Sequence, residues 1–243
     1  MRLQFVGSGD AFGSGGRFNT CLHLTGERTN LLIDCGATSL VAIKKLGLDR
    51  GAIDGILVTH FHADHFGGLP FFILDQQLNV KRSRPLLIAG PGGLTERYER
   101  AMAVAFPGER QLPFRLTLTE LEIGAANSLP DLRVTPYHVV HDDRAGPCLA
   151  YRIEAEGKVI CYSGDTEWTD ALLEAARGAD LFICECYMFE KPRKSHMSLA
   201  TLRKHLPAIG AKRVVLTHLS EDMLGRLDEV DLEIAEDGKI VDV

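Results

Sequence analysis

Four side chains that commonly bind metal ions occur within six residues of the sequence, at His60, His62, Asp64 and His65. They follow residues 56–59, an apolar run with the character of a buried strand. Because His60 and His62 are two positions apart, their side chains project to the same side of an extended segment. Imidazole and carboxylate groups bind zinc, and also manganese or iron. The cluster therefore predicts the start of two adjacent metal sites at the end of a strand.

The composition is that of a globular protein with a hydrophobic core: 243 residues, 45% of them hydrophobic and 25% charged. A formal net charge of −6 argues against nucleic-acid binding through overall charge. No apolar run reaches the roughly 18–20 residues of a membrane span, and the N-terminus lacks a signal-peptide pattern. The six cysteines form no C-x-x-C pair. We therefore expect a reduced, cytoplasmic protein that does not bind membranes.

The two halves of the chain repeat one order of elements, in which a strand, an amphipathic helix and a second strand follow one another. In the first half, a strand over 30–33 reaches Asp34, a helix covers 37–46, and the strand 56–59 reaches His60. The corresponding elements of the second half are a strand over 158–162, a helix over 169–177 and a strand over 181–184. The repeat predicts two related β/α halves, arranged either as two sheets face to face with helices outside or as one mixed sheet.

Further elements are expected outside this repeat. Residues 21–24 should pair with 30–33 as a hairpin, and residues 69–78 should form a helix that serves either as core or as a homodimer face. A helix over 198–205 is expected to stop before Pro207. Residues 229–243 are expected to form a final hairpin around Asp237-Gly238.

A pair of metal ions needs about seven protein ligands, so further ligands are expected at strand ends that face the same cavity. His141 follows a strand over 132–137, and His138 is the alternative at the same strand end. Asp165 follows the strand 158–162 and has two oxygens with which to bridge two cations, and His218 follows a strand over 213–216. Our assignment places His60, His62 and His141 on one metal and Asp64, His65 and His218 on the other, with Asp165 between them.

The ordered series His60-x-His62-x-Asp64-His65, a lone histidine, Gly164-Asp165-Thr166 and Thr217-His218 resembles the metallo-β-lactamase superfamily of binuclear metallohydrolases. The resemblance spans nearly the whole chain and implies a single domain over residues 1–243 with a four-layer αββα sandwich. It also implies two divalent metal ions at one edge of the sheets, foremost Zn²⁺ and otherwise Mn²⁺ or Fe. In addition, it implies that Asp34 orients a ligand histidine.

Within the superfamily, the sequence is most similar to the ribonuclease Z and phosphodiesterase branch. The supporting segments are residues 64–70, 89–93, 184–186 and 195–198. Zinc β-lactamases carry a cysteine where Asp165 stands, flavo-diiron proteins usually carry a glutamate where His62 stands, and glyoxalase II adds a long helical region after the last ligand. Ribonuclease Z has a tRNA-clamping arm between the lone histidine and the Gly-Asp-Thr motif, and no such arm fits between His141 and Asp165.

The resemblance implies a phosphodiesterase that uses a metal-bridging hydroxide. Asp64 would bind metal and orient or deprotonate the nucleophile, while His196, backed by Glu185, would protonate the leaving oxygen. The charged residues 191–194 either hold a phosphate or form a solvated loop. The expected substrate is a small-molecule or nucleotide phosphodiester, and structured tRNA is not expected. The alternatives are hydrolysis of a carboxylic ester, lactone or thioester at the same metals, and a non-enzymatic metal-holding binding or sensor module.

Overall fold

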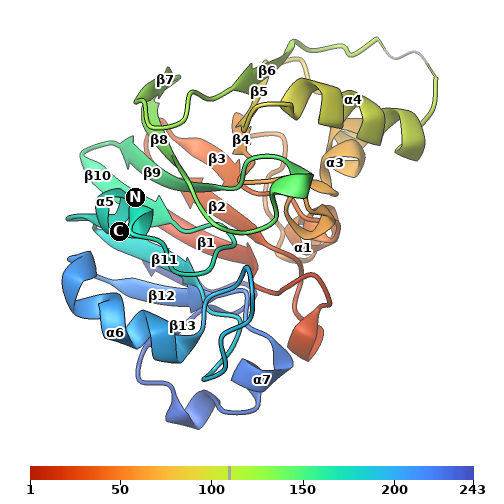
Figure 1. The fold of residues 1–243 in the computed structure, drawn as a ribbon. Helices are drawn as coiled ribbons and strands as arrows, with labels where there is room; N and C mark the ends of the chain where they lie inside the picture. Colours follow the sequence, from red (N-terminus) through yellow and green to blue (C-terminus); the bar gives the residue numbers. More distant parts are fainter. Residues whose placement is uncertain (109–110) are drawn as a thin grey trace.

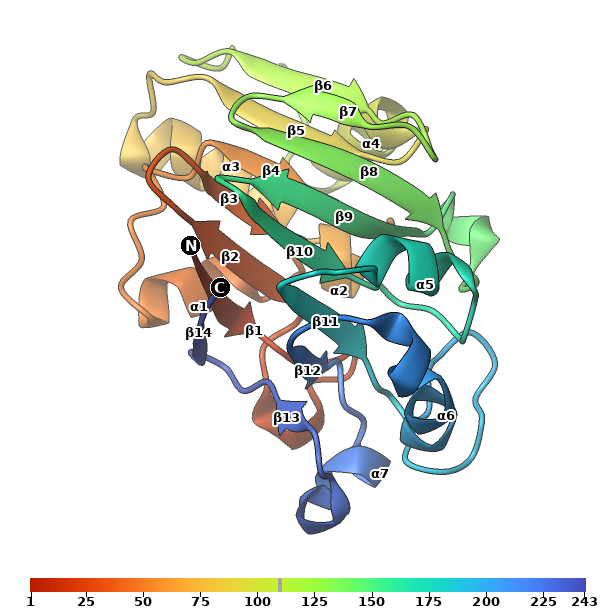
Figure 2. The same cartoon turned by 90° about the vertical axis from the view of Figure 1, so that its left-hand side faces the viewer.

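In the computed structural model, which describes residues 1–108 and 111–243, the strands form two seven-stranded sheets that pack face to face. Helices cover the outer side of each sheet, as Figures 1 and 2 show. This arrangement is the αββα sandwich, so the fold class expected from the sequence is confirmed. Of the two arrangements that the repeat allowed, two facing sheets is the correct one.

Both sheets are mixed. The N-terminal sheet consists, in spatial order, of β14 (Ile240–Asp242), β1 (Arg2–Gly7), β2 (Cys21–Thr25), β3 (Asn30–Ile33), β4 (Gly55–Leu57), β5 (Leu86–Gly90) and β6 (Leu116–Glu120). The C-terminal sheet consists of β13 (Glu233–Ile234), β12 (Val214–Thr217), β11 (Leu181–Glu185), β10 (Lys158–Tyr162), β9 (Leu149–Ala155), β8 (Leu132–His138) and β7 (Asn127–Leu129). Strands β3 to β6 run parallel in the first sheet, and β10 to β13 in the second, so the carboxyl ends of both parallel halves can carry site residues.

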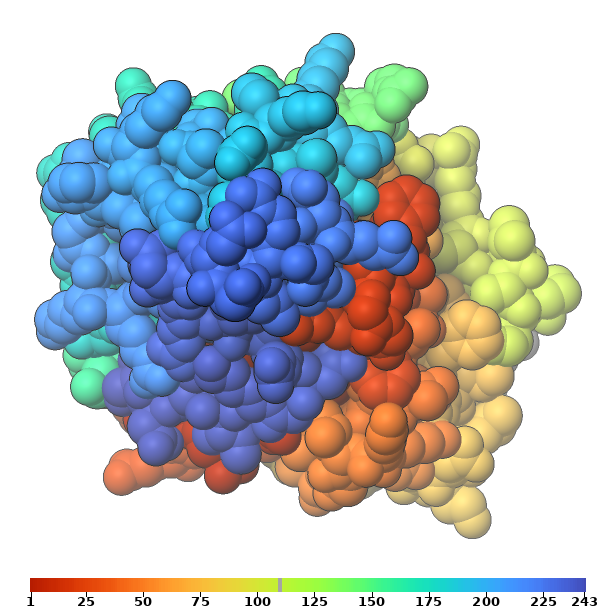
Figure 3. Space-filling model, turned by 90° about the horizontal axis from the view of Figure 1, so that it is seen from below, coloured from red at the N-terminus to blue at the C-terminus, as the bar shows by residue number. Residues whose placement is uncertain are grey.

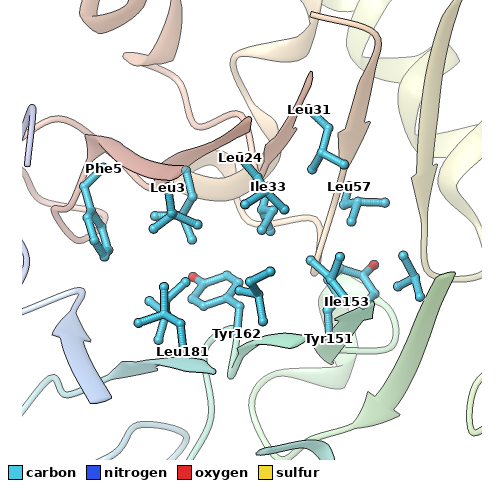
Figure 4. Close-up of a cluster of buried hydrophobic side chains, with 14 of the residues drawn as sticks. Leu3, Phe5, Leu24, Leu31, Ile33, Leu57, Tyr151, Ile153, Tyr162 and Leu181 are labelled. Carbon is cyan, nitrogen blue, oxygen red and sulfur yellow. The ribbon is translucent and has the colours of Figure 1, made fainter. Parts of the chain in front are cut away.

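The space between the sheets is filled by alternate side chains of the strands, because successive residues of a strand point to opposite faces. Figure 4 shows Leu3, Phe5 and Ile33 of the N-terminal sheet pointing toward Tyr162 and Leu181 of the C-terminal sheet. All of these side chains are fully buried. The same alternation sends a second set of side chains outward, where they pack against the helices.

Each helical layer covers one sheet. The helices over the N-terminal sheet are α1 (Ser39–Lys45), α2 (Ala63–Phe66), α3 (Leu69–Asp75) and α4 (Leu94–Ala105), and those over the C-terminal sheet are α5 (Ala171–Ala176) and α6 (Leu199–Ile209). Helix α7 (Glu221–Leu224) lies beside the short helix η1 (Ser14–Gly16), so segments from opposite ends of the chain adjoin on the face shown in Figure 3. None of the helices in the described parts of the chain combines the length and the apolar character that crossing a bilayer requires.

Two expected elements differ in the structure. The helix expected over 198–205 continues to Ile209 with Pro207 inside it, and ends at Gly210, whose φ of 68° is left-handed. Its buried face, which includes Leu202 and Ile209, keeps the last turn against the sheet despite the missing proline N–H. The expected terminal hairpin is also wrong: β13 pairs with β12 and β14 pairs with β1, so the chain crosses from one sheet to the other between them.

Two other elements expected from the sequence are present in the structure. Strands β2 and β3 form the expected antiparallel hairpin. The helix expected over 69–78 is present as α3, which ends at Asp75 and continues as a π-helical turn, Gln76–Val80. Leu69, Phe72 and Ile73 of α3 are buried core residues, whereas Phe71 is exposed. A homodimer face on this helix stays a prediction.

Two fully buried tyrosines on neighbouring strands allow a test of what one hydroxyl contributes to stability. The Tyr151 hydroxyl donates a hydrogen bond of 2.5 Å to the carbonyl oxygen of Val58, in the opposite sheet. We expect Tyr151→Phe to lower the free energy of unfolding by about 1–3 kcal/mol, because a buried carbonyl loses this donor. The Tyr162 hydroxyl has no partner among the described residues, so Tyr162→Phe should leave stability unchanged or raise it. Urea unfolding followed by circular dichroism measures both, and equal losses would contradict the prediction.

Candidate metal centre

Seven histidine and aspartate side chains from distant parts of the chain converge at one edge of the two sheets. They follow the carboxyl ends of β4, β8, β10 and β12. Strands that run in the same direction end at the same edge of a sheet, so these side chains lie close together. Their potential ligand atoms form two groups, each with its atoms within 4.8 Å of one another: His60, His62 and His141 in the first, and Asp64, His65, Asp165 and His218 in the second. The six histidines and aspartates other than Asp165 divide as the sequence analysis assigned them, whereas Asp165, expected between the two metals, falls in the second group.

In the first group, three ring nitrogens face one another. His60 Nε2 lies 3.2 Å from His62 Nδ1, and His141 Nε2 lies 3.0 Å from the same Nδ1. His138, the alternative to His141, points elsewhere: its side chain is 51% exposed and lies 3.3 Å from Asp143, whereas that of His141 is 4% exposed. The geometry therefore brings His141, and not His138, into the cluster.

In the second group, the carboxylates alternate with imidazoles. His65 Nε2 lies 3.3 Å from Asp64 Oδ2 and 3.2 Å from Asp165 Oδ1. His218 Nε2 lies 3.2 Å from Asp64 Oδ2 and 3.4 Å from Asp165 Oδ2. Asp165 also reaches to 3.8 Å from His141 Nε2 of the first group. Asp165 thus lies between the two groups, where a bridging ligand would stand.

The chemistry of this donor set fits a pair of divalent cations. His65 Nε2 and Asp165 Oδ1 are buried and lie 3.2 Å apart, but neither forms a hydrogen bond with the other or with any other described residue, and such unsatisfied atoms are costly. In the first group, the three ring nitrogens that face one another cannot all be satisfied by hydrogen bonds among themselves. A cation would satisfy both sets of atoms, and imidazole with carboxylate is the donor set of zinc and of related transition metals.

The protonation states of His60 and Asp165 also favour cation binding. Burial, together with the neighbouring His65, lowers the pKa of His60 well below its ordinary value. Burial disfavours a charge on Asp165, but His218 and His65 hold the pKa of its carboxyl well below the usual range. Burial likewise opposes a charge on His65, and Asp165, Asp64 and Asp34 outweigh it and raise the pKa of this imidazole. A neutral His60 and an ionised Asp165 are the forms that bind metal, and a cation would compete with the proton on His65.

Asp34 lies outside the cluster and contacts the nitrogen of His65 that is turned away from it. Its Oδ2 accepts a hydrogen bond of 2.7 Å from His65 Nδ1, and its Oδ1 accepts from the backbone N–H of Thr59 at 2.7 Å. The Thr59 hydroxyl lies 2.8 Å from Oδ2 as well. The turn after Asp34 passes so close to α2 that a Cβ at Gly36 would lie 2.0 Å from the Asp64 carbonyl oxygen. The structure thus shows Asp34 against the outer nitrogen of a candidate ligand histidine, as the resemblance implied.

His196 and Glu185 form a pair at the border of the cluster. His196 Nδ1 lies 3.1 Å from Glu185 Oε2, and a ring nitrogen of His196 is within 4.8 Å of the ligand atoms of His141 and Asp165. Glu185 is fully buried at the end of β11, and burial next to Asp165 raises the pKa of its carboxyl well above the ordinary value. Burial lowers the pKa of His196. The ring of Tyr187 stacks on His196 with the centroids 4.6 Å apart.

The sequence analysis did not identify the residues that lie against the outer nitrogens of two histidines. His141 Nδ1 lies 2.7 Å from the Ser195 carbonyl oxygen, and the Ser195 hydroxyl donates to the His141 carbonyl at 2.7 Å. Asp142 Oδ2 lies 3.6 Å from His62 Nε2 and accepts a 2.7 Å bond from Arg144. The only sequence signal was adjacency, since Ser195 precedes His196 and Asp142 follows His141.

This αββα fold with a histidine–aspartate cluster at the sheet edge defines a metallo-β-lactamase-fold protein of the ribonuclease Z type. A family profile described as "Anti-Pycsar protein Apyc1" matches residues 1–239. The chain therefore belongs to that family, and the branch expected from the sequence is confirmed.

Similar proteins span nearly the same length. Ribonuclease Z of Agathobacter rectalis is 28% identical over 261 residues, which cover 86% of this chain and 84% of that enzyme. The crystal structure of human tRNase Z, short form, matches with a TM-score of 0.83 at 24% identity and covers 100% of this chain and 99% of that one. The Zn²⁺-bound structure of PqqB from Methylobacterium extorquens matches with a TM-score of 0.75 at 17% identity, covering 100% of both chains. The two structural matches establish the fold.

Asp142 offers a test of the cluster that does not depend on activity. A carboxylate on the outer nitrogen of a ligand histidine typically accounts for about 10–100-fold in metal affinity. We expect Asp142→Ala to weaken one of two Zn²⁺ binding steps by that factor, as measured by competition with a chromogenic chelator. Asp143→Ala is the matched control, because Asp143 is exposed and faces His138 instead. Equal affinities in the two variants would mean that Asp142 does not orient His62.

Proposed function

We propose that the chain is a binuclear metal-dependent hydrolase of phosphodiester bonds. The observation that carries the proposal is the position of the His196–Glu185 pair beside the seven candidate ligands. Hydrolysis of a phosphodiester breaks a P–O bond and releases an alkoxide, which a titratable group beside the metals can protonate. The phosphodiesterase branch in which the resemblance places the sequence, and the ribonuclease Z relatives, support the same reaction.

The proposed ligands are those that the sequence indicated. His60, His62 and His141 would hold one cation and Asp64, His65 and His218 the other, with Asp165 shared. Bound divalent cations supply positive charge for the ester and a water whose pKa falls toward neutrality, which is the source of the hydroxide. Zn²⁺ is the proposed metal because imidazole nitrogens dominate the donor set, and the Zn²⁺ bound by PqqB, a protein of the same fold, supports it. Mn²⁺ and Fe suit the same donors.

Side chains around the candidate ligands would donate the proton and orient the nucleophile. His196 has Nδ1 turned to Glu185, so Nε2 is the nitrogen from which a proton would pass to the leaving oxygen. The contact with Glu185 fixes the orientation of the His196 ring, and Glu185 itself accepts a hydrogen bond from the backbone N–H of Thr166. Asp64, which lies between His65 and His218, would orient the attacking nucleophile through the carboxylate oxygen that does not face them.

The substrate that we propose is a small-molecule or nucleotide phosphodiester. Arg193 lies 5.1 Å above the Tyr187 ring, which stacks on His196, and so a cation stands near the general acid where a phosphate would lie. The interval between His141 and Asp165 holds only the short helix η3 (Asp143–Ala145) and the hairpin of β9 and β10. This interval leaves no room for a tRNA-clamping arm, so structured tRNA is not the proposed substrate.

Three histidine variants test this mechanism with thymidylyl-(3′→5′)-thymidine as substrate, a nucleotide phosphodiester whose leaving group is an alkoxide. His196→Ala should lower kcat by about 10²–10⁴-fold, the usual contribution of a general acid, while the bound metal content stays the same. His141→Ala should lose both activity and part of the metal. His138→Ala is the matched control, because this histidine lies on the same strand end but outside the cluster, and it should retain both.

The controls of this experiment separate the alternatives. A His196→Ala enzyme that hydrolyses the phosphodiester at the normal rate would contradict the general-acid role. Loss of metal and activity in His138→Ala, with His141→Ala unaffected, would overturn the ligand assignment. Turnover of a lactone or thioester without turnover of any phosphodiester would replace the proposed reaction by carboxylic ester chemistry at the same site.

A further inference from the structure

A cavity with a volume of about 650 Å³ lies between the two sheets, and it is lined by none of the candidate metal ligands. All three residues of strand β4, from Gly55 to Leu57, line the cavity, whereas His60 lies three residues beyond Leu57 and does not line it. Figure 4 shows Leu31 and Leu57 pointing into the space between the sheets at this border of the core. A volume of this size is in the range of small-molecule sites.

The floor of the cavity is a row of side chains across four strands of the N-terminal sheet. The strand register places Leu31 beside Gly55, Gly55 beside Leu87, and Leu87 beside Thr117. A Cβ built on Gly55 would meet the Leu87 carbonyl oxygen at 3.7 Å and the Leu31 Cβ at 3.9 Å, which are ordinary contacts. The sheet could therefore carry a larger side chain here, and the glycine leaves the middle of an otherwise apolar floor open.

Strand β6 makes the inner wall polar where a sandwich core would be apolar. Leu116 and Leu118 pack into the helical layer outside the sheet, so the alternation turns Thr117 and Thr119 toward the other sheet. Arg115 is in phase with these threonines and also lines the cavity. The cavity thus combines an apolar floor with hydroxyl and guanidinium groups along one side, a combination typical of a site that binds an amphipathic molecule.

The charges at the mouth favour an anion. Arg84 pairs with Asp54 at 2.5 Å, and Arg28 lies 3.9 Å from Asp131, so both carboxylates that line the cavity already have a cation. Arg115 is exposed and forms no ion pair with the residues that the structure describes. Among the described residues, one guanidinium therefore faces the cavity without a counter-charge, and a guanidinium binds carboxylates and phosphates through paired hydrogen bonds.

We propose that this cavity binds a single-chain amphiphile with an anionic head, whose apolar chain lies over Gly55 and whose head group is bound by Arg115. The head is a carboxylate or a phosphate monoester, since both match the guanidinium fork. The threonine hydroxyls of β6 supply hydrogen-bond donors next to that head. The site is separate from the candidate metal centre, because none of the seven candidate metal ligands lines the cavity.

Calorimetric titration of the full chain with ten-carbon amphiphiles tests the proposal. Decanoate and decyl phosphate should bind, and comparing them identifies the head group, whereas decyltrimethylammonium should bind at least about tenfold more weakly. Gly55→Leu should abolish binding of both anions by filling the floor. Arg115→Glu should weaken the anions by about tenfold or more, and Arg177→Glu, the same charge change at an exposed arginine outside the cavity, should not.

Two controls distinguish a loss of binding from a loss of folding. Near-ultraviolet circular dichroism and the thermal midpoint show whether Gly55→Leu is folded, and Arg115→Glu, on the surface, tests the same site without touching the core. Equal affinity for the cationic and anionic amphiphiles, undiminished binding to folded Gly55→Leu, or no binding of any amphiphile to the natural chain would each overturn the proposal.

Discussion

The buried carboxylate of Asp34 is the contact on which the geometry of the candidate metal centre depends. It accepts hydrogen bonds from Thr59, the residue before His60, and from the outer nitrogen of His65. One side chain at the end of β3 therefore fixes both ends of the histidine-rich segment that follows β4. Burial raises the pKa of this carboxyl, although the bonds from His65 and Thr59 act in the opposite direction. A buried anion of this kind is tolerated only while each of these partners is present.

Backbone strain marks the same site from both sheets. Asp34 has a φ of 61° and His218 a φ of 59°, a left-handed conformation that costs a non-glycine residue about 1–3 kcal/mol. Each strained residue follows the end of a parallel strand, and a hydrogen bond from another segment holds it or its neighbour. The Cys35 N–H donates to the His65 carbonyl at 2.7 Å, and the His218 N–H donates to the Ser8 carbonyl at 3.0 Å. The turns direct the two side chains to opposite sides of the cluster, one as candidate ligand and one as support.

The sequence predicted what depends on local spacing and left out what depends on contacts between distant segments. The period of two placed His60 and His62 together, and the repeated strand endings pointed to Asp165 and His218. The contacts of Ser195 with His141 and of Asp142 with His62 span 54 and 80 residues, and no local pattern marks them. Asp237-Gly238 reads as a hairpin turn, but the Asp237 carboxylate accepts from the Ser8 N–H at 2.9 Å and the Phe18 N–H at 2.8 Å. These bonds to the loop that follows the first strand hold the tail beside the other sheet.

Ser195 joins the candidate ligands to the candidate general acid. It occupies the left-handed position, with φ 70°, of a turn in which the His196 N–H donates to the Arg193 carbonyl at 3.1 Å. The carbonyl of Ser195 accepts from the His141 ring, so the turn and the metal-ligand cluster share one hydrogen bond. A movement of this loop would shift His196 and the His141 ring together, because one residue contacts both. This turn, together with the contact of His196 with Glu185, thus sets the distance between the proton donor and the metal ligands, whereas the exposed residues 190–192 lie outside the turn.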